Sequence, residues 1–141
     1  MSYKYKVKRK VGTINPEAEA KYYAVPHSSG RVSTAEVAKE IEAATTLTQS
    51  DVLGAIAALS KVIERKVSDG YSVKLDGLGV FSLSITSEGF TDAAKCTPHK
   101  VKAKKIYLRA DSKLKEAIKD VKFERYVQPE IASLQPKGKK Q

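Results

Sequence analysis

Tryptophan is absent from this 141-residue sequence, which has only one cysteine and two histidines. The single cysteine, Cys96, excludes an internal disulfide, and His27 and His99 add too few ligands for a structural zinc site. No apolar run approaches the roughly 18 residues that a membrane-spanning helix needs, and no apolar signal core follows the first lysines. We therefore expect a soluble, intracellular protein without a metal ion, another cofactor or a membrane partner.

Acidic residues are in the minority, since 16 Asp and Glu stand against 26 Lys and Arg, and the formal net charge is +10. The excess is uneven: residues 1–31 carry +5, residues 32–89 carry −3, and residues 90–141 carry +8. Hydrophobic residues make up 41% of the chain, which suits about one folded domain. The mildly acidic middle therefore fits a scaffold, and the basic ends predict a polyanionic partner.

A row of lysines alternates with tyrosine and valine near the N-terminus. This period of two over residues 3–11 predicts a β-strand, and residues 20–25 predict a second short one. The lysines either protect an exposed edge strand against aggregation or face the phosphates of a partner, and both interpretations stay open. The row consists of Lys4, Lys6, Lys8 and Lys10.

Two start signals predict consecutive helices in the middle of the chain. Ser33 and Glu36 have the spacing of a capping box, and Thr48 with Asp51 repeats the signal. The second helix is expected to end at Asp69-Gly70, and the two helices to share an apolar seam. The apolar stripe of the second helix is Val52, Ile56, Leu59, Ile63 and Val67.

Strands and a last helix are expected in the second half. Residues 71–75 and 79–86 predict a hairpin around a tight Asp76-Gly77 turn, and residues 102–110 predict a third strand. Residues 87–101 lack a sustained period. Helical spacing then continues from about Asp111 to Val121, and residues 124–141 predict a basic, flexible tail.

One segment carries a family resemblance. Residues 73–83 read Val-Lys-Leu-Asp-Gly-Leu-Gly-Val-Phe-Ser-Leu. This resembles the signature of the HU/IHF family of bacterial histone-like DNA-binding proteins, which runs apolar-x-apolar-x-Gly-Phe-Gly-x-Phe. The resemblance covers roughly residues 33–121, and the N-terminal strand is similar to that of the extended HU-like (HU-HIG) subfamily.

The resemblance implies an α+β fold with a helical hairpin, an antiparallel β-sheet, a protruding β-arm and a C-terminal helix, in an intertwined dimer with an extra N-terminal β-strand. Residues 1–32 are then the extension, residues 33–123 the HU-like DNA-binding domain with its arm at about 87–101, and residues 124–141 the tail.

The function implied by the resemblance is that of a bacterial nucleoid-associated homodimer in the cytoplasm, which binds double-stranded DNA with low sequence specificity and bends or bridges it. A possible minor-groove wedge is Pro98 or Phe90, and the lysine row would supply accessory contacts. No small-molecule substrate and no enzymatic activity are expected. The DNA-binding residues implied are Lys95, Lys100, Lys102, Lys104, Lys105, Arg109 and Lys113.

Three departures from the family pattern keep alternatives open. The arm lacks the family's Arg-Asn-Pro tripeptide and is also shorter. The outward side of the second strand carries Ser82, Ser84 and Thr86, followed by Glu88, where the family has arginines, and this removes positive charge from the floor of the saddle. An HU-like fold reused as a structural or protein-interaction module is therefore the alternative hypothesis, and RNA binding through the same basic surface is a third.

Overall fold

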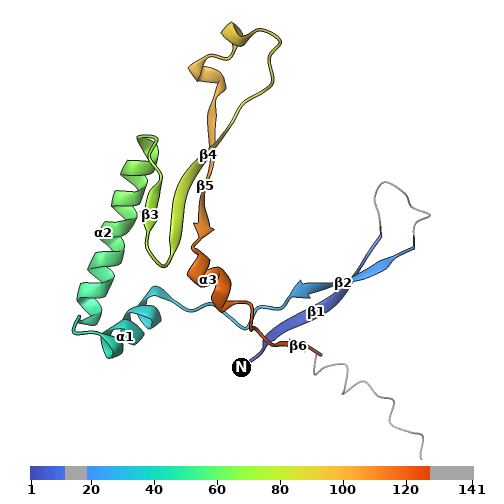
Figure 1. Cartoon of the computed structure of the whole chain (residues 1–141), viewed down its shortest axis with the longest axis vertical. Helices are drawn as coiled ribbons and strands as arrows, with labels where there is room; N and C mark the ends of the chain where they lie inside the picture. The colour runs from blue at the N-terminus through green and yellow to red at the C-terminus, as the bar shows by residue number, and fades with distance from the viewer. Residues whose placement is uncertain (12–18, 128–141) are drawn as a thin grey trace, which may run out of the picture. The chain divides into compact units, whose positions relative to one another are not determined.

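The computed structural model describes residues 1–11 and 19–127. Within these ranges the chain forms two compact units, a terminal unit that contains β1, β2 and β6, and a central unit of residues 32–119. The mixed α+β class is as predicted. The elements are β1 (Tyr3–Lys10), β2 (Lys21–Pro26), α1 (Thr34–Ala44), α2 (Gln49–Ser68), β3 (Val73–Leu75), β4 (Gly79–Thr86), the 3₁₀ turns η1 (Ala93–Lys95) and η2 (Pro98–Lys100), β5 (Lys102–Ala110), α3 (Ser112–Ala117) and β6 (Phe123–Arg125) (Figure 1).

Two capping boxes start the long helices of the central unit. Ser33 Oγ accepts a hydrogen bond from the Glu36 N–H at 3.2 Å, and the Glu36 carboxylate accepts one from the Ser33 N–H at 2.7 Å. Thr48 and Asp51 form the same reciprocal pair at 3.1 and 3.2 Å. Each box satisfies backbone donors that the first helical turn leaves free. Both predicted helix starts are thus confirmed. None of the described helices combines the length and hydrophobicity needed to cross a bilayer.

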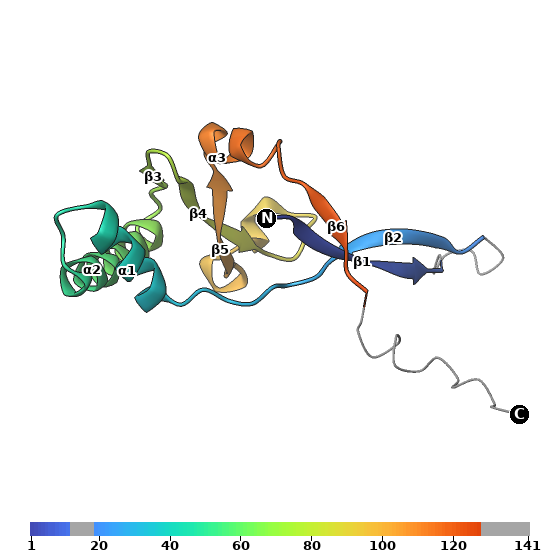
Figure 2. The same cartoon turned by 90° about the horizontal axis from the view of Figure 1, so that it is seen from below.

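The central sheet has the strand order β3-β4-β5, and both pairs are antiparallel. Side chains alternate between its faces, so Phe81 and Leu83 share one face and Ser82 and Ser84 the other. Both cartoon views show α2 alongside β3 (Figures 1 and 2). The apolar face of the sheet meets α2 at a groove of about 500 Å³, lined by Ile56, Leu59, Ser60, Ile63, Glu64, Phe81 and Ile106.

The last helix, α3, is shorter than the sequence predicts. It ends at Ala117 rather than near Val121. The Lys119 N–H donates to the Glu116 carbonyl at 3.2 Å, which is the tighter 3₁₀ spacing. Ile118, which has the helical spacing predicted for this segment, is 67% exposed. Most helical stability in proteins comes from the packing of an apolar face, so this segment has little to hold a further turn.

The terminal sheet has the order β2-β1-β6, with β1 antiparallel to β2 and parallel to β6. The parallel ladder is closed by the Tyr3 N–H, which donates to the Lys122 carbonyl at 2.7 Å, and by the Tyr126 N–H, which donates to the Tyr5 carbonyl at 2.8 Å. The Tyr3 and Phe123 rings meet edge to face, with centroids 5.8 Å apart. Hydrogen bonds and ring contact together hold β6 against β1.

This strand corrects the predicted start of the tail. Residues 124 and 125 belong to β6 and are not part of a flexible segment, because the backbone of β1 gives them hydrogen-bonding partners. Tyr126, the next residue of the expected tail, also bonds to β1 through its N–H, and residues 128–141 lie outside the described residues. The second strand, predicted at 20–25, is observed one residue later.

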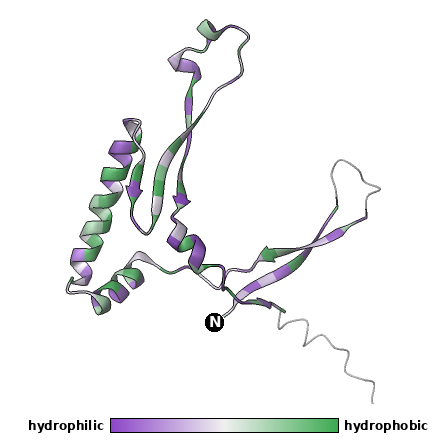
Figure 3. Cartoon of the chain, viewed as in Figure 1, coloured by the Kyte–Doolittle hydropathy of each residue, from purple (hydrophilic) through white to green (hydrophobic). Residues whose placement is uncertain are grey.

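Few apolar side chains are fully covered in the isolated chain. Among the described residues only Ala38, Val52 and Val67 are buried hydrophobics. Apolar residues continue along much of α2, coloured green in Figure 3, and Ile106 on β5 is 52% exposed. The central unit therefore leaves a large apolar surface in contact with water.

Candidate nucleic-acid interface

The face of the central sheet that points away from α2 is polar. On β4 it carries Ser82 and Ser84, and the ladder places Tyr107 opposite Ser82 and Lys105 opposite Ser84. The Ser84 hydroxyl donates to the Lys105 carbonyl at 3.3 Å, which ties the two strands together at this point. We call this surface the polar face. Its described members are Lys74, Val80, Ser82, Ser84, Thr86, Lys102, Lys105, Tyr107 and Arg109.

A β-bulge determines which lysines of β5 share that face. The ladder pairs Ser84 with Lys105 and Ile85 with Ala103, so Lys104 is the extra residue. Lys102 and Lys105 are three positions apart, and strict alternation would place them on opposite faces. The bulge restores the alignment, and Lys102 lies opposite Thr86, on the same face as Lys105.

The expectation that the sheet floor lacks positive charge is therefore wrong. It rested on β4 alone, where serine and threonine replace arginine. The neighbouring strand supplies the charge instead, because Arg109 pairs with Val80, Lys105 with Ser84, and Lys102 with Thr86. The positive charge of this face lies on β5 and on β3, beside the hydroxyls of β4.

The sequence-based prediction missed one cation of this face. Lys74 on β3 pairs with Val80, which in turn pairs with Arg109, so the three positions form a row across the sheet. Its ammonium lies 3.9 Å from the Asp76 carboxylate, and both side chains are largely exposed. Such an exposed ion pair contributes little to the stability of the fold, so Lys74 stays available to a ligand. The alternation of Lys74 with Val73 and Leu75 was the available signal.

The β4–β5 connection, residues 87–101, carries the other predicted contacts. Figure 1 shows its two short helical turns at the end far from the sheet. Lys95 closes η1 and Lys100 closes η2, and both are exposed. Pro98, the first residue of η2, is exposed, whereas Phe90 is half-buried. Of the two wedge candidates, Pro98 is the more accessible.

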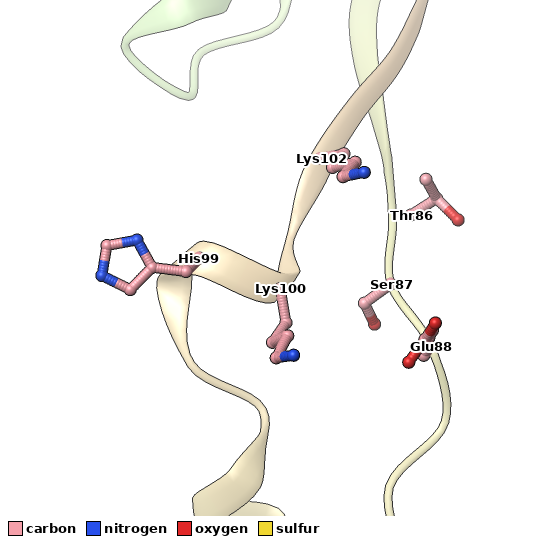
Figure 4. Close-up of a pocket in the computed structure, with 6 residues that line it drawn as sticks. All are labelled: Thr86, Ser87, Glu88, His99, Lys100 and Lys102. Carbon is pink, nitrogen blue, oxygen red and sulfur yellow. The ribbon is translucent and has the colours of Figure 1, made fainter.

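An open pocket of about 420 Å³ lies where the connection leaves the sheet (Figure 4). Lys100 and Lys102 lie where the chain enters β5, and Glu88 lies where it leaves β4, while the His99 ring points away from them. The carboxylate of Glu88 reduces the positive potential that the two lysines create. The lining residues are Thr86, Ser87, Glu88, His99, Lys100 and Lys102.

The remaining predicted residues do not join the polar face, and all of them are exposed except Lys6, which is half-buried. Lys113 lies on α3, and Lys104 occupies the bulge. The lysine row of β1 belongs to the terminal unit. Cys96 is a free, exposed thiol. In residues 1–11 and 19–127 no three His, Cys, Asp or Glu side chains gather in a way that could hold a metal ion.

Comparison with known proteins gives a family match over most of the chain. Residues 1–125 match the sequence model of HU-HIG, described as "HU domain fused to wHTH, Ig, or Glycine-rich motif". A search of curated proteins found no match.

A solved structure supports the fold. The chain is similar to a protein from Bacteroides vulgatus ATCC 8482 described as a "Putative bacterial DNA binding protein". The TM-score is 0.59 at 13% sequence identity, and the alignment covers 89% of this chain and 49% of that one. The chain thus spans about half the length of that protein. At this level of identity the similarity shows the fold alone.

Proposed function

Because the chain belongs to the HU-HIG family, we propose that it is a nucleoid-associated protein of the bacterial cytoplasm that binds double-stranded DNA with low sequence specificity. The observation that carries the proposal is the polar face, where Lys74, Lys102, Lys105 and Arg109 surround the hydroxyls of β4. It acts by binding and bending or bridging DNA, and not by catalysis.

The chemistry of the polar face suits the phosphate backbone. Lysine and arginine neutralise phosphates and release counterions, and neither contact reads sequence. Ser82, Ser84 and Tyr107 add hydroxyl donors that reach phosphate or sugar oxygens. None of these groups is arranged as a planar pair for a particular base edge, so we expect low specificity.

The β4–β5 connection extends the interface. Lys95 and Lys100 follow the duplex beyond the sheet, and Pro98 enters the minor groove as an apolar wedge. Glu88 lies beside Lys100 and Lys102 and weakens, without abolishing, their attraction for phosphate. The sheet and the far end of the connection supply the other contacts, and a duplex held at both places is bent.

A second copy of the chain covers the apolar groove between α2 and the sheet. Ile56 and Ile106 line this groove and are exposed in the single chain. A central unit with so few buried side chains gains most of its apolar burial by dimerisation. In the dimer the two polar faces offer twice the number of cations to one duplex.

A salt series of duplex binding tests the proposal. Random-sequence duplex DNA should be retained at low salt, with affinity that falls steeply as salt increases. The double substitution Lys102→Glu with Lys105→Glu should abolish retention of the duplex. The control Lys61→Glu replaces a single lysine on α2, which is not part of the polar face, and should reduce retention far less. Absence of duplex binding by the wild-type chain at low salt contradicts the proposal.

The protein-interaction alternative predicts a different result. If the fold is reused as a protein-binding module, association with a protein partner survives the double substitution and duplex binding is weak from the start. Competition between duplex DNA and RNA of equal length, at the same salt concentration, shows which of the two nucleic acids the chain prefers.

A further inference from the structure

The lysine row of the terminal unit is only partly explained by edge protection. Charged residues protect a strand whose backbone groups are unpaired, but β1 is the central strand of its sheet. Lys4 and Lys6 lie where β1 is flanked by residues 25–27 on one side and by residues 123–126 on the other. Only Lys8 and Lys10 extend past β6 along an unpaired edge. The first two lysines therefore need another explanation.

Aromatic rings lie among these lysines. Tyr23 pairs with Lys8 across the β1–β2 ladder and so shares its face. The Lys6 ammonium lies 5.3 Å from the centre of the Tyr126 ring, and that of Lys10 lies 5.7 Å from the centre of the Tyr23 ring. His27 stacks on Tyr126, with centroids 3.8 Å apart and an angle of 14° between the rings.

We call this surface the lysine face, and its members are Lys4, Lys6, Lys8, Lys10, Lys21, Tyr23, Val25, His27, Glu124 and Tyr126.

The charge of this surface is largely uncompensated. Among the described residues of the terminal unit there are nine Lys and Arg against three acids, and no ion pair within 4.0 Å is found there. Glu124, which pairs with Lys4 across the ladder, accepts a hydrogen bond from the Ser2 hydroxyl at 2.7 Å. Phosphates are thus the natural counter-charge for the row.

We propose that the lysine face binds single-stranded nucleic acid, with the lysines on phosphates and the exposed ring of Tyr23 stacked on a base, while the Tyr126 ring stays packed against His27. Non-specific binders of single strands combine a basic track with aromatic platforms in this way. The cation–π contact between Lys10 and Tyr23 is at an exposed site and is weak, so an arriving base displaces Lys10 from the ring, and the freed ammonium moves to a phosphate.

Unpaired bases fit this surface better than a duplex does. Lysines alone would suffice for the backbone of a duplex, but its bases are stacked within the helix and cannot lie on a tyrosine ring. Tyr23 is 48% exposed, so part of this side chain is accessible to a base. The site is separate from the polar face and does not depend on the proposed binding of double-stranded DNA.

Adjacent residues of β2 provide a matched test. Tyr23 lies on the lysine face, whereas Tyr22 pairs with Arg9 on the opposite face. In the full chain, Tyr23→Ala should weaken binding of an oligo-dT 20-mer by about tenfold, the loss typical of one stacked base. Tyr22→Ala removes a ring of the same size and should leave the affinity unchanged. An equal effect of the two substitutions overturns the stacking role.

Neighbouring charges on β1 allow the same comparison. Lys8→Glu should weaken oligo-dT binding more than Arg9→Glu, because Arg9 lies on the opposite face. An equal loss for both would show that net charge alone drives binding and would overturn the proposal. An oligo-U 20-mer distinguishes RNA from DNA, and a poly-glutamate probe tests for an acidic polypeptide. Tighter binding of poly-glutamate than of either oligonucleotide also overturns it.

Intrinsic fluorescence adds a readout that a merely structural role would not change. The chain has seven tyrosines and no tryptophan, so stacking should quench its tyrosine emission directly. Quenching by oligo-dT should be smaller in Tyr23→Ala than in Tyr22→Ala. The double variant with Lys102→Glu and Lys105→Glu should still bind oligo-dT, although it no longer binds duplex DNA. Failure of oligo-dT binding with duplex binding intact refutes this inference alone.

Discussion

Gly79 and Arg109 approach so closely across the β4–β5 ladder that a Cβ on Gly79 would overlap the Arg109 carbonyl. The same Cβ would lie 3.0 Å from Leu108 Cδ1. Gly79 also has a φ of +147°, a conformation that residues with side chains rarely adopt. This glycine of the family signature therefore sets the approach of the strand that carries the basic residues of the polar face.

Gly79→Ala should destabilise the central unit. We expect a loss of about 2–4 kcal/mol in the free energy of unfolding, because the strain of the backbone adds to an overlap with backbone atoms that cannot move aside. Urea unfolding followed by circular dichroism measures it. Gly89→Ala is the control, since nothing lies within 4 Å of a Cβ there. Equal unfolding midpoints for the two variants would contradict the steric account.

Asp111 is a second point of stability. One carboxylate oxygen accepts from the Gly77 N–H at 3.0 Å and the other from the Ser112 N–H at 2.8 Å, which joins the β3–β4 turn to the start of α3. Asp111→Ala should cost about 1–2 kcal/mol in the free energy of unfolding, the usual range for a lost cap. Asp111→Asn keeps one acceptor and should lose less. Thermal unfolding of the two variants measures the difference, and equal losses would argue against the cap.

Local signals account for what the sequence predicted well. The capping boxes at Ser33 and Thr48 satisfy donors within three residues, so their pattern is complete in the sequence. The alternation of β1 and β4 is likewise local. The family resemblance rested on the glycines around the β3–β4 turn, where the positive φ of Gly77 and Gly79 is a local requirement, although the close approach of Arg109 to Gly79 is not. These features fixed the α+β class and the order of elements up to α3.

Non-local pairing explains what was missed. β6 has three residues, too few for a period to be visible, and its partner β1 lies at the other end of the chain. The bulge at Lys104 depends on the pairing of β4 with β5, and alternation along β5 alone places Lys102 and Lys105 on opposite faces. Alternation along one strand does not show which residues its neighbour adds to the same face, so the sequence alone underestimates the charge of the polar face.

Dimerisation should depend on the apolar groove of the central unit. Ile56→Glu places a carboxylate on the face that the second copy is proposed to cover, where desolvation of an unpaired charge is costly. We expect the dimer to dissociate at micromolar concentration, with association weakened at least about 100-fold. Sedimentation equilibrium measures it. Lys61→Glu on the same helix is the control and should remain dimeric. A wild-type monomer at this concentration would refute the groove as a dimer interface.

The polar face should be visible in the salt dependence of duplex binding. Each phosphate neutralised by a lysine contributes about −0.9 to the slope of log affinity against log salt. Lys105→Gln should therefore reduce the magnitude of the slope by about 1 per chain, and by about 2 for a dimer with both faces on one duplex. The loss of affinity should be nearly the same for all duplex sequences, because a phosphate contact carries no base information.

Lys61→Gln provides the matched control for this slope, because α2 lies against the other face of the sheet. Its slope should equal that of the wild type, although the net charge falls by the same amount. An equal reduction in both variants would mean that duplex binding follows total charge, without a defined face. A sequence-dependent loss in Lys105→Gln would instead point to base contacts, which the arrangement of single cations and hydroxyls on β4 and β5 does not favour.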